Sequence, residues 1–161
     1  MKRVGSGTQK VEQELFDLFP KAKVLRMDAD TVGASRGHEA LLREFEEKKI
    51  PILLGTQMVA KGLDFENVTL VGVLDADLSL YAQNYHAAER TYSLLAQVVG
   101  RAGRGERPGR AVIQTYHPEN EVIQAAAKQD YKTFYQNELR MRSLRRYPPF
   151  ADLFTLTVSG L

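Results

Sequence analysis

Two short segments of the sequence combine glycines with side chains that can hold a phosphate or a sugar. The first is residues 55–65, GTQMVAKGLDF, which directly follows a compact apolar run. Thr56 and Gln57 offer a hydroxyl, an amide and backbone N–H groups, and Gly62 permits a close backbone approach. Asp64 can accept hydrogen bonds from a ribose or hold an arginine. The alternative is a strand-to-helix turn in which the threonine caps the helix and the aspartate is satisfied locally.

The second segment is residues 97–105, QVVGRAGRG. Arg101 and Arg104 lie three positions apart, on one face of a helical turn, and the neighbouring glycines leave room for a bulky ligand. Guanidinium groups match phosphate oxygens with paired donors and can stabilise the charge that develops during phosphoryl transfer. The alternative is a basic surface turn, because Gly-Arg loops are common.

The elements that must position these segments alternate between helix and strand. Apolar spacing predicts helices over residues 11–19, 38–48 and 85–100, and compact apolar runs predict strands over 23–27, 50–55, 68–74 and 111–116. Continuous apolar strands are expected where helices cover both faces of a sheet. The sequence therefore predicts an α/β layered domain with a mainly parallel sheet. Residues 55–65 then follow a strand at the carboxyl edge, where such sheets bind ligands.

The last part of the chain is predicted to be a helical extension. One long helix is expected over residues 118–142, with a core-facing stripe formed by Ile123, Ala127, Tyr131, Phe134, Tyr135 and Leu139. Residues 147–150, YPPF, break this helix, and residues 153–159 alternate like a strand. We therefore divide the chain into residues 1–117, a partial helical-and-strand lobe, and residues 118–161, which lead into a truncated further domain.

Positive charge is concentrated in the second half of the chain. Residues 101–146 contain ten Lys and Arg against five Asp and Glu, whereas the whole chain has a net charge of +2. The asymmetry indicates either a polyanionic partner, phosphate or nucleic acid, or a solvated basic face. Four arginines, 140, 142, 145 and 146, are candidates for DNA contacts, although the C-terminal end of a helix favours cations in any case.

Composition excludes several kinds of protein and of site. With 161 residues, 43% hydrophobic and 26% charged, the chain is typical of a soluble globular domain. No apolar run approaches the ~20 residues of a membrane helix, and the first residues do not form a signal peptide. The absence of cysteine excludes disulfides and thiolate metal sites, and three histidines are too few to predict a zinc site.

Together the two segments resemble motifs V and VI of superfamily-two helicases. Residues 55–62 with Asp64 and Phe65 are similar to motif V, and Gln97, Gly100, Arg101 and Arg104 are similar to motif VI. Residues 7–12, 69–77, 88–91, 113–116 and 147–150 narrow the resemblance to the primosomal replication-restart helicases, over nearly the whole chain. Leu63 and Glu66 depart from the histidine and proline that many relatives carry, which can alter the conformation of this loop.

Asp75 and Asp77 look like a magnesium pair, but we expect capping and salt-bridge roles in this lobe.

The resemblance implies the second RecA-like lobe of a two-lobed motor that binds ATP between its lobes. Arg101 and Arg104 would reach the γ-phosphate as arginine fingers, and Gln97 would position the nucleotide or the attacking water. The resemblance also implies that the nucleotide is contacted by Gly62, Asp64 and Gly100. It implies that the backbone of single-stranded DNA is contacted by Thr56, Gln57 and Lys61.

The first lobe would hold most of the ATP and magnesium, because residues 1–161 contain no Gly-Lys-Ser/Thr phosphate loop. We therefore expect the isolated fragment to be inactive. Zinc is implied for the family's full-length proteins, but not for this fragment. The resemblance also implies a cytoplasmic, monomeric protein that acts on single-stranded or forked DNA with primosome proteins and single-strand binding protein. Two alternatives stay open: another superfamily-two repair helicase, and a non-catalytic nucleic-acid-binding or docking scaffold.

Overall fold

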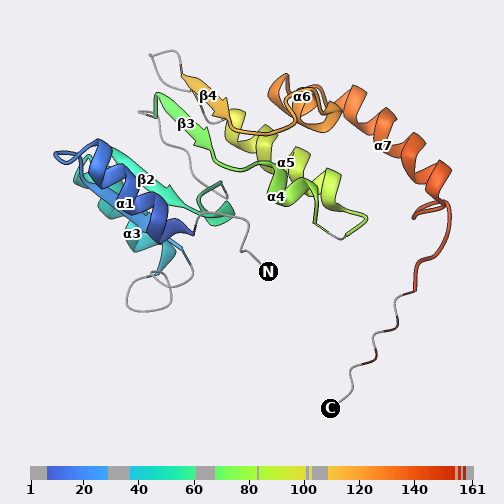
Figure 1. The fold of residues 1–161 in the computed structure, drawn as a ribbon, viewed down its shortest axis with the longest axis horizontal. Coiled ribbons are helices and arrows are strands. Elements are labelled where there is room, and N and C mark those ends of the chain that lie inside the picture. The colour runs from blue at the N-terminus through green and yellow to red at the C-terminus, as the bar shows by residue number, and fades with distance from the viewer. Residues whose placement is uncertain are drawn as a thin grey trace.

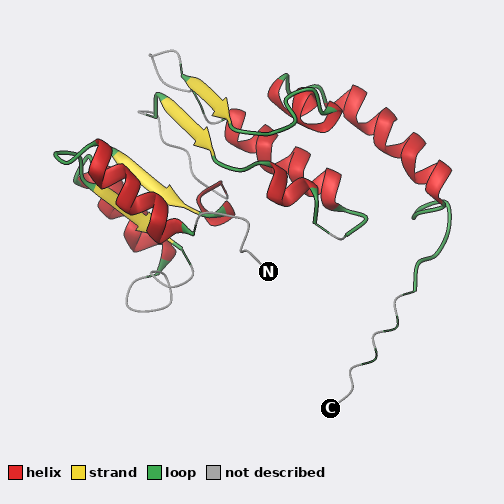
Figure 2. Cartoon of the chain, in the orientation of Figure 1, coloured by secondary structure: helices red, strands yellow, loops and turns green. Residues whose placement is uncertain are grey.

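Two separate pairs of parallel strands form the framework of the molecule (Figures 1 and 2). The computed structural model describes residues 7–28, 37–60, 68–82, 84–100, 102, 109–154, 156 and 158. The first pair consists of β1 (Val24–Met27) and β2 (Ile52–Gly55), and the second of β3 (Leu70–Val73) and β4 (Arg110–Ile113). Both pairs are parallel, as the apolar runs predict. The predicted α/β fold class with parallel strands is therefore confirmed.

Two helices pack against the first strand pair. They are α1 (Thr8–Leu18) and α3 (His38–Glu47), and both contact β1. The core of this half is small: Met27 and Leu41 form its buried cluster, against which Leu25, Leu42, Leu53 and Val59 pack, and Ile50 before β2 is buried as well. An ion pair between Arg26 on β1 and Glu12 on α1, with 2.8 Å between Nη1 and Oε2, fastens helix to strand.

Four helices accompany the second strand pair. They are α4 (Asp77–Leu80), α5 (Ala87–Val99), α6 (Glu121–Ala127) and α7 (Tyr131–Arg145). The larger core lies here, formed by Ala76, Tyr92, Leu95, Ile123, Ala125, Ala126 and Phe134. Tyr92 of α5 stacks on Phe134 of α7, with 4.2 Å between ring centroids and 11° between ring planes. This half therefore contains most of the buried apolar surface of the described chain.

The predicted single helix over residues 118–142 is wrong, because the chain forms two helices with a turn between them. Gln129 has a positive φ of 55°, which an α-helix does not allow. Asp130 then starts α7, and its carboxylate accepts hydrogen bonds from the backbone N–H of Thr133 at 3.0 Å and from its hydroxyl at 2.7 Å. These hydrogen bonds hold the pKa of Asp130 below its ordinary value. The capping aspartate thus interrupts a pattern of apolar spacing that continues across it.

Two further expectations for the last part of the chain are also corrected. The aromatic stripe does not face the core as a whole: Phe134 is buried, but Tyr131 and Tyr135 are 62% and 50% exposed. The short α6 aligns Ile123 with the core, while the turn rotates α7 so that these tyrosines face outward. The described residues between 153 and 158 form no strand, and Phe154 is 92% exposed. An isolated strand has no partner for its backbone groups, which explains this outcome.

The sheet predicted as one layer is divided by a gap between β2 and β3. Each of these strands pairs on one edge only within the described residues. In Figure 1 the two pairs lie side by side with their arrows pointing the same way. Among the helices that the structure describes, none combines the length and the apolar character needed to cross a bilayer.

Candidate functional site

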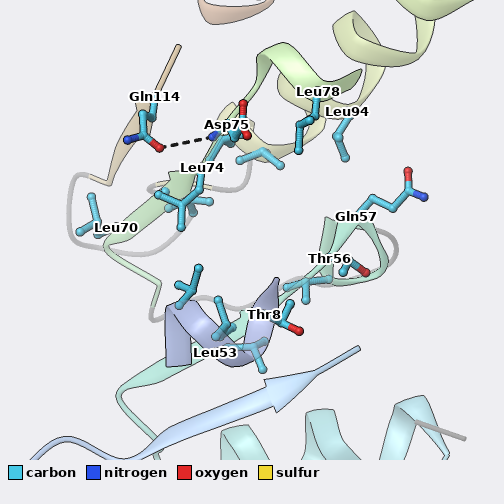
Figure 3. Close-up of a pocket in the computed structure, with 18 of the residues that line it drawn as sticks. Thr8, Leu53, Thr56, Gln57, Leu70, Leu74, Asp75, Leu78, Leu94 and Gln114 are labelled. Carbon is cyan, nitrogen blue, oxygen red and sulfur yellow. Dashed lines mark hydrogen bonds between the residues drawn. The ribbon is translucent and has the colours of Figure 1, made fainter. Parts of the chain in front are cut away.

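A cavity of about 830 Å³ lies between the two strand pairs. Its apolar walls come from β2 and β3 and include Leu53, Leu54, Val71 and Val73. Polar residues that follow the strands line it as well: Thr56 and Gln57 after β2, Asp75 and Asp77 after β3, and Gln114 and Thr115 after β4. Figure 3 shows Thr56 and Gln57 on one side of this space and Asp75 with Gln114 on the other. The carboxyl ends of three parallel strands therefore contribute to one cavity, as expected of an α/β ligand site.

Thr56 and Gln57 are presented by a tight turn at the end of β2. The carbonyl of Thr56 accepts a hydrogen bond of 3.0 Å from the N–H of Val59, which begins the 3₁₀ helix η1 (Gln57–Ala60). Gly55 makes the turn possible, since a Cβ atom there would overlap the carbonyl oxygen of Met27 and the side chain of Val59. Thr56 and Gln57 are both exposed. Their hydroxyl and amide groups are thus free to face a ligand such as a phosphodiester backbone.

The helix that leads into the second motif lies against η1. Leu94 and Val98 of α5 line the same cavity as Thr56 and Gln57. The side chain of Gln97 is exposed, and its Nε2 donates to Ser93 Oγ at 3.3 Å. The last turn of α5 and the turn after β2 are therefore neighbours, although Val98 rather than Gln97 is the cavity-lining residue of that turn.

Gly100 ends α5 and is closely approached by the turn between α6 and α7. Its N–H donates to the carbonyl of Ala96 at 2.9 Å. A Cβ atom at Gly100 would lie 2.9 Å from Gln129 Nε2, which itself donates to Ala96 O at 3.4 Å. Glycine here lets the second motif begin against the α6–α7 turn, a contact that sequence spacing could not reveal.

Five of the predicted site residues, Lys61, Gly62, Asp64, Arg101 and Arg104, lie outside the described residues. The predictions for Thr56, Gln57, Gln97 and Gly100 concern residues that the structure places around one cavity and at the end of one adjoining helix.

The two aspartates after β3 have structural contacts. Asp77 is buried, and its carboxylate accepts hydrogen bonds from Tyr116 N at 2.9 Å and Thr115 Oγ1 at 3.0 Å. The bond from Tyr116 is the main reason that the pKa of Asp77 lies below its ordinary value. The backbone N–H of Asp75 donates to Gln114 Oε1 at 3.4 Å, as Figure 3 shows. Asp77 thus fixes the chain after β4 to the start of α4, a structural role, although it does so by these hydrogen bonds and not by the predicted capping: the N-cap of α4 is Ala76, with no side-chain cap hydrogen bond.

No group of His, Cys, Asp and Glu side chains within the described ranges is arranged to hold a metal ion. Besides the carboxylates of Glu14, Asp75 and Asp77, the cavity is lined by the hydroxyl and amide groups of Thr56, Gln57, Gln114 and Thr115, which can hydrogen-bond to a phosphate or a sugar.

Sequence reasoning missed a charged network at the other end of α5. Arg142, 8% exposed, donates from Nη2 to Glu89 Oε1 at 2.9 Å and from Nε to Glu138 Oε1 at 2.8 Å. His86 Nδ1 lies 2.6 Å from Glu89 Oε2. Burial would lower the pKa of Arg142, but the hydrogen bond to Glu138 and the charge of Glu89 outweigh it and raise the pKa above its ordinary value. These contacts engage the donors of Arg142 within the protein, which favours the helix-end explanation over a DNA contact for this arginine. His86 and Glu89 are three positions apart, a spacing that permits this pairing within one helix.

Comparisons with known proteins place the chain in a helicase family. A family described as "Helicase conserved C-terminal domain" matches residues 4–106. The replication restart protein PriA of Bacillus subtilis is 54% identical to this chain over 155 residues. The PriA protein of Synechocystis is 46% identical over 160 residues, and that of Chlamydia pneumoniae is 42% identical over 156 residues. The aligned regions cover 96–99% of this chain but only 19–21% of these relatives, so the chain spans about one fifth of their length. The predicted resemblance to replication-restart helicases is thus confirmed, and the chain belongs to the helicase conserved C-terminal domain family.

Proposed function

We propose that this chain is the second motor lobe of an ATP-dependent DNA helicase that acts in replication restart. The observation that carries the proposal is the contact between η1 and α5. Helix η1 follows β2 and lies within motif V, and α5 leads into motif VI. A motor must couple the state of its bound nucleotide to its affinity for DNA. This contact joins motif V, which is expected to bind DNA, to motif VI, which is expected to bind the nucleotide. The similarity to replication restart proteins supports the cellular role.

Each candidate residue receives a role in this proposal. Thr56, Gln57 and Lys61 bind the phosphodiester backbone of single-stranded DNA, which carries no sequence information. Gly62, Asp64 and Gly100 contact the nucleotide. Gln97 orients the nucleotide or the attacking water, and Arg101 and Arg104 stabilise the charge on the γ-phosphate during its transfer. Closure of two lobes around ATP and their reopening then move the strand.

The remaining parts of the motor belong to the longer protein. ATP and Mg²⁺ are held mainly by a first lobe with a phosphate loop, and zinc by cysteines elsewhere in the full-length protein. We place that protein in the cytoplasm as a monomer, acting on single-stranded or forked DNA with primosome proteins and single-strand binding protein. We propose residues 1–117 as the lobe and residues 118–161 as the part that leads into the next domain, with α6 and α7 packed on α5 of the lobe.

Within the part of the chain that the structure describes, β2 and β3 each pair on one edge only, and this supports the proposal that the isolated segment is inactive. Unpaired edge strands expose backbone donors and acceptors, and apolar residues of both strands line the cavity between them. Hydrogen exchange on the full-length protein and on residues 1–161 compares the amides of these two strands. We expect them to be protected in the full-length protein and to exchange faster in the segment. Equal protection in both would show that the segment needs no other part of the protein to order its strands.

Mutation of the two arginines in the full-length protein tests the proposed function. We expect Arg101→Ala and Arg104→Ala each to lower DNA-stimulated ATP hydrolysis by about 10³-fold while ATP binding is largely kept. Arg90→Ala is the matched control, because Arg90 is an exposed arginine on α5 outside the motif. Unchanged hydrolysis in both motif variants would refute the arginine-finger role and favour the scaffold alternative.

A further inference from the structure

We propose that Arg142 is a positioning residue for the nucleotide-contacting end of α5, through which the segment after α7 influences the rate of ATP hydrolysis. The inference rests on the proposed function. It assigns a role to a charged network that lies away from motifs V and VI and that neither motif explains.

Arg142 joins three parts of the chain. Its guanidinium contacts Glu89 in the first turn of α5 and Glu138 on α7. Its Nη1 also donates to the carbonyl oxygen of Pro148, beyond the end of α7, at 3.1 Å. The ring of Tyr85, just before α5, lies 5.4 Å from the guanidinium carbon and completes the site as a cation–π partner. One side chain therefore fastens the start of α5 to the end of α7 and to the turn after it.

The ion pairs of Arg142 differ from surface ion pairs because the arginine itself is buried. The side chains of Arg142 and Glu138 are only 10% and 16% exposed, whereas Glu89 on α5 is 42% exposed. Removing a buried guanidinium leaves its carboxylate partners uncompensated, which costs far more than losing an exposed pair. The network therefore favours one arrangement of α7 relative to α5.

Helix α5 can pass this constraint to its other end. It is a 13-residue helix, about 20 Å long, that α6 and α7 hold along its length. Tyr92 stacks on Phe134 near its middle, and Gln129 contacts Ala96 and Gly100 at its end. A shift of α7 thus displaces the turn from which Arg101 follows, and small misplacements of catalytic groups have large effects on rate.

The experiment compares variants of the full-length protein at saturating single-stranded DNA. Arg142→Ala removes the network, Arg142→Lys keeps its charge, and Gln136→Ala is the control because Gln136 is exposed on the same helix. The readouts are kcat and KM for ATP, the Kd for a labelled oligonucleotide, and the Tm. For Arg142→Ala we expect kcat to fall about tenfold while KM and Kd stay within about twofold. Arg142→Lys should recover part of kcat, and Gln136→Ala should match the wild type.

Two results would overturn the inference. An unchanged kcat with a lowered Tm would make Arg142 a purely structural residue. A weakened Kd with kcat intact would make it a DNA contact. If Arg142→Ala does not fold, Glu89→Gln removes one charge of the network while keeping an accepting oxygen, and an unchanged kcat in that variant also overturns the inference.

The Arg101→Ala variant separates failure of this inference from failure of the proposed function. Hydrolysis that survives Arg101→Ala contradicts the function itself. Hydrolysis that is lost in Arg101→Ala but kept in Arg142→Ala contradicts only the positioning role.

Discussion

The half of the molecule built on β1 and β2 and the half built on β3 and β4 use the same parallel strand pair but differ in what covers it. In the first half α1 contributes no buried residue, and its Phe16 and Leu18 are 57% and 70% exposed. In the second half α5 contributes four, Ala87, Thr91, Tyr92 and Leu95. A similar pattern of elements therefore does not guarantee a similar core.

The difference in buried core suggests which half has the more stable structure. Burial of a large apolar side chain contributes about 1.5–3 kcal/mol, so several buried side chains separate the two cores by a large fraction of the stability of a domain. The motif V turn that carries Thr56 and Gln57 is attached to the half with the smaller core. The helix of motif VI is attached to the half with the larger core. We infer that the first half is the one more easily moved by a ligand.

Truncation of one buried leucine in each half gives the largest expected effect. We expect Leu95→Ala, at a residue 1% exposed, to lower the opening free energy of α5 by about 4 kcal/mol, and Leu41→Ala to lower that of α3 by about 2 kcal/mol. Native-state hydrogen exchange on the full-length protein measures both. Equal losses would contradict the difference between the cores.

A glycine in each half gives the next test. In Gly55→Ala the new methyl group would overlap the Met27 carbonyl, so we expect a loss of about 2 kcal/mol. Gly72 on β3 has open space around it, and Gly72→Ala should be neutral or stabilise the protein by about 0.5 kcal/mol. Chemical denaturation of both variants checks the pair. A neutral Gly55→Ala would show that the turn before Thr56 relaxes easily.

Replacing the carboxylate of Asp77 is expected to have the smallest effect on stability, and the effect is expected only at acidic pH. Its pKa is lowered in the folded protein, mainly by the hydrogen bond from Tyr116 N. Its stabilising contribution is therefore fully present above the unfolded pKa of about 3.9 and is lost as the pH falls below that value towards the folded pKa. Unfolding of the wild type and of Asp77→Asn between about pH 2.5 and pH 6 measures this. A parallel pH dependence in the two proteins would contradict a role for Asp77.

Sequence patterns predicted the strands and the place of the first motif, but not the contacts between distant segments. The apolar runs located β2 and β3 because each strand is short and bounded by polar residues or glycine. The helix break at Gln129 was missed because Tyr131 and Phe134 continue the spacing of Ile123. The Asp130–Thr133 pair was the available signal, since it has the spacing of an N-cap.

Two features had no local signal at all. The separation of the sheet into two pairs depends on which edges meet, and apolar runs do not encode strand order. The burial of Arg142 depends on Glu89, which lies 53 positions earlier in the chain. An arginine near the end of a helix otherwise resembles a solvated cation.

The most direct measurement of the link between the two motifs is the dependence of ATP hydrolysis on DNA concentration in Thr56→Val of the full-length protein. The substitution removes the exposed hydroxyl next to η1 and keeps the side-chain volume. We predict that half-maximal stimulation requires about fivefold more single-stranded DNA, the loss of about one hydrogen bond, while the rate without DNA is unchanged. Thr69→Val, at an exposed threonine before β3, should match the wild type. An unaltered DNA dependence in Thr56→Val would contradict a DNA contact at the turn after β2.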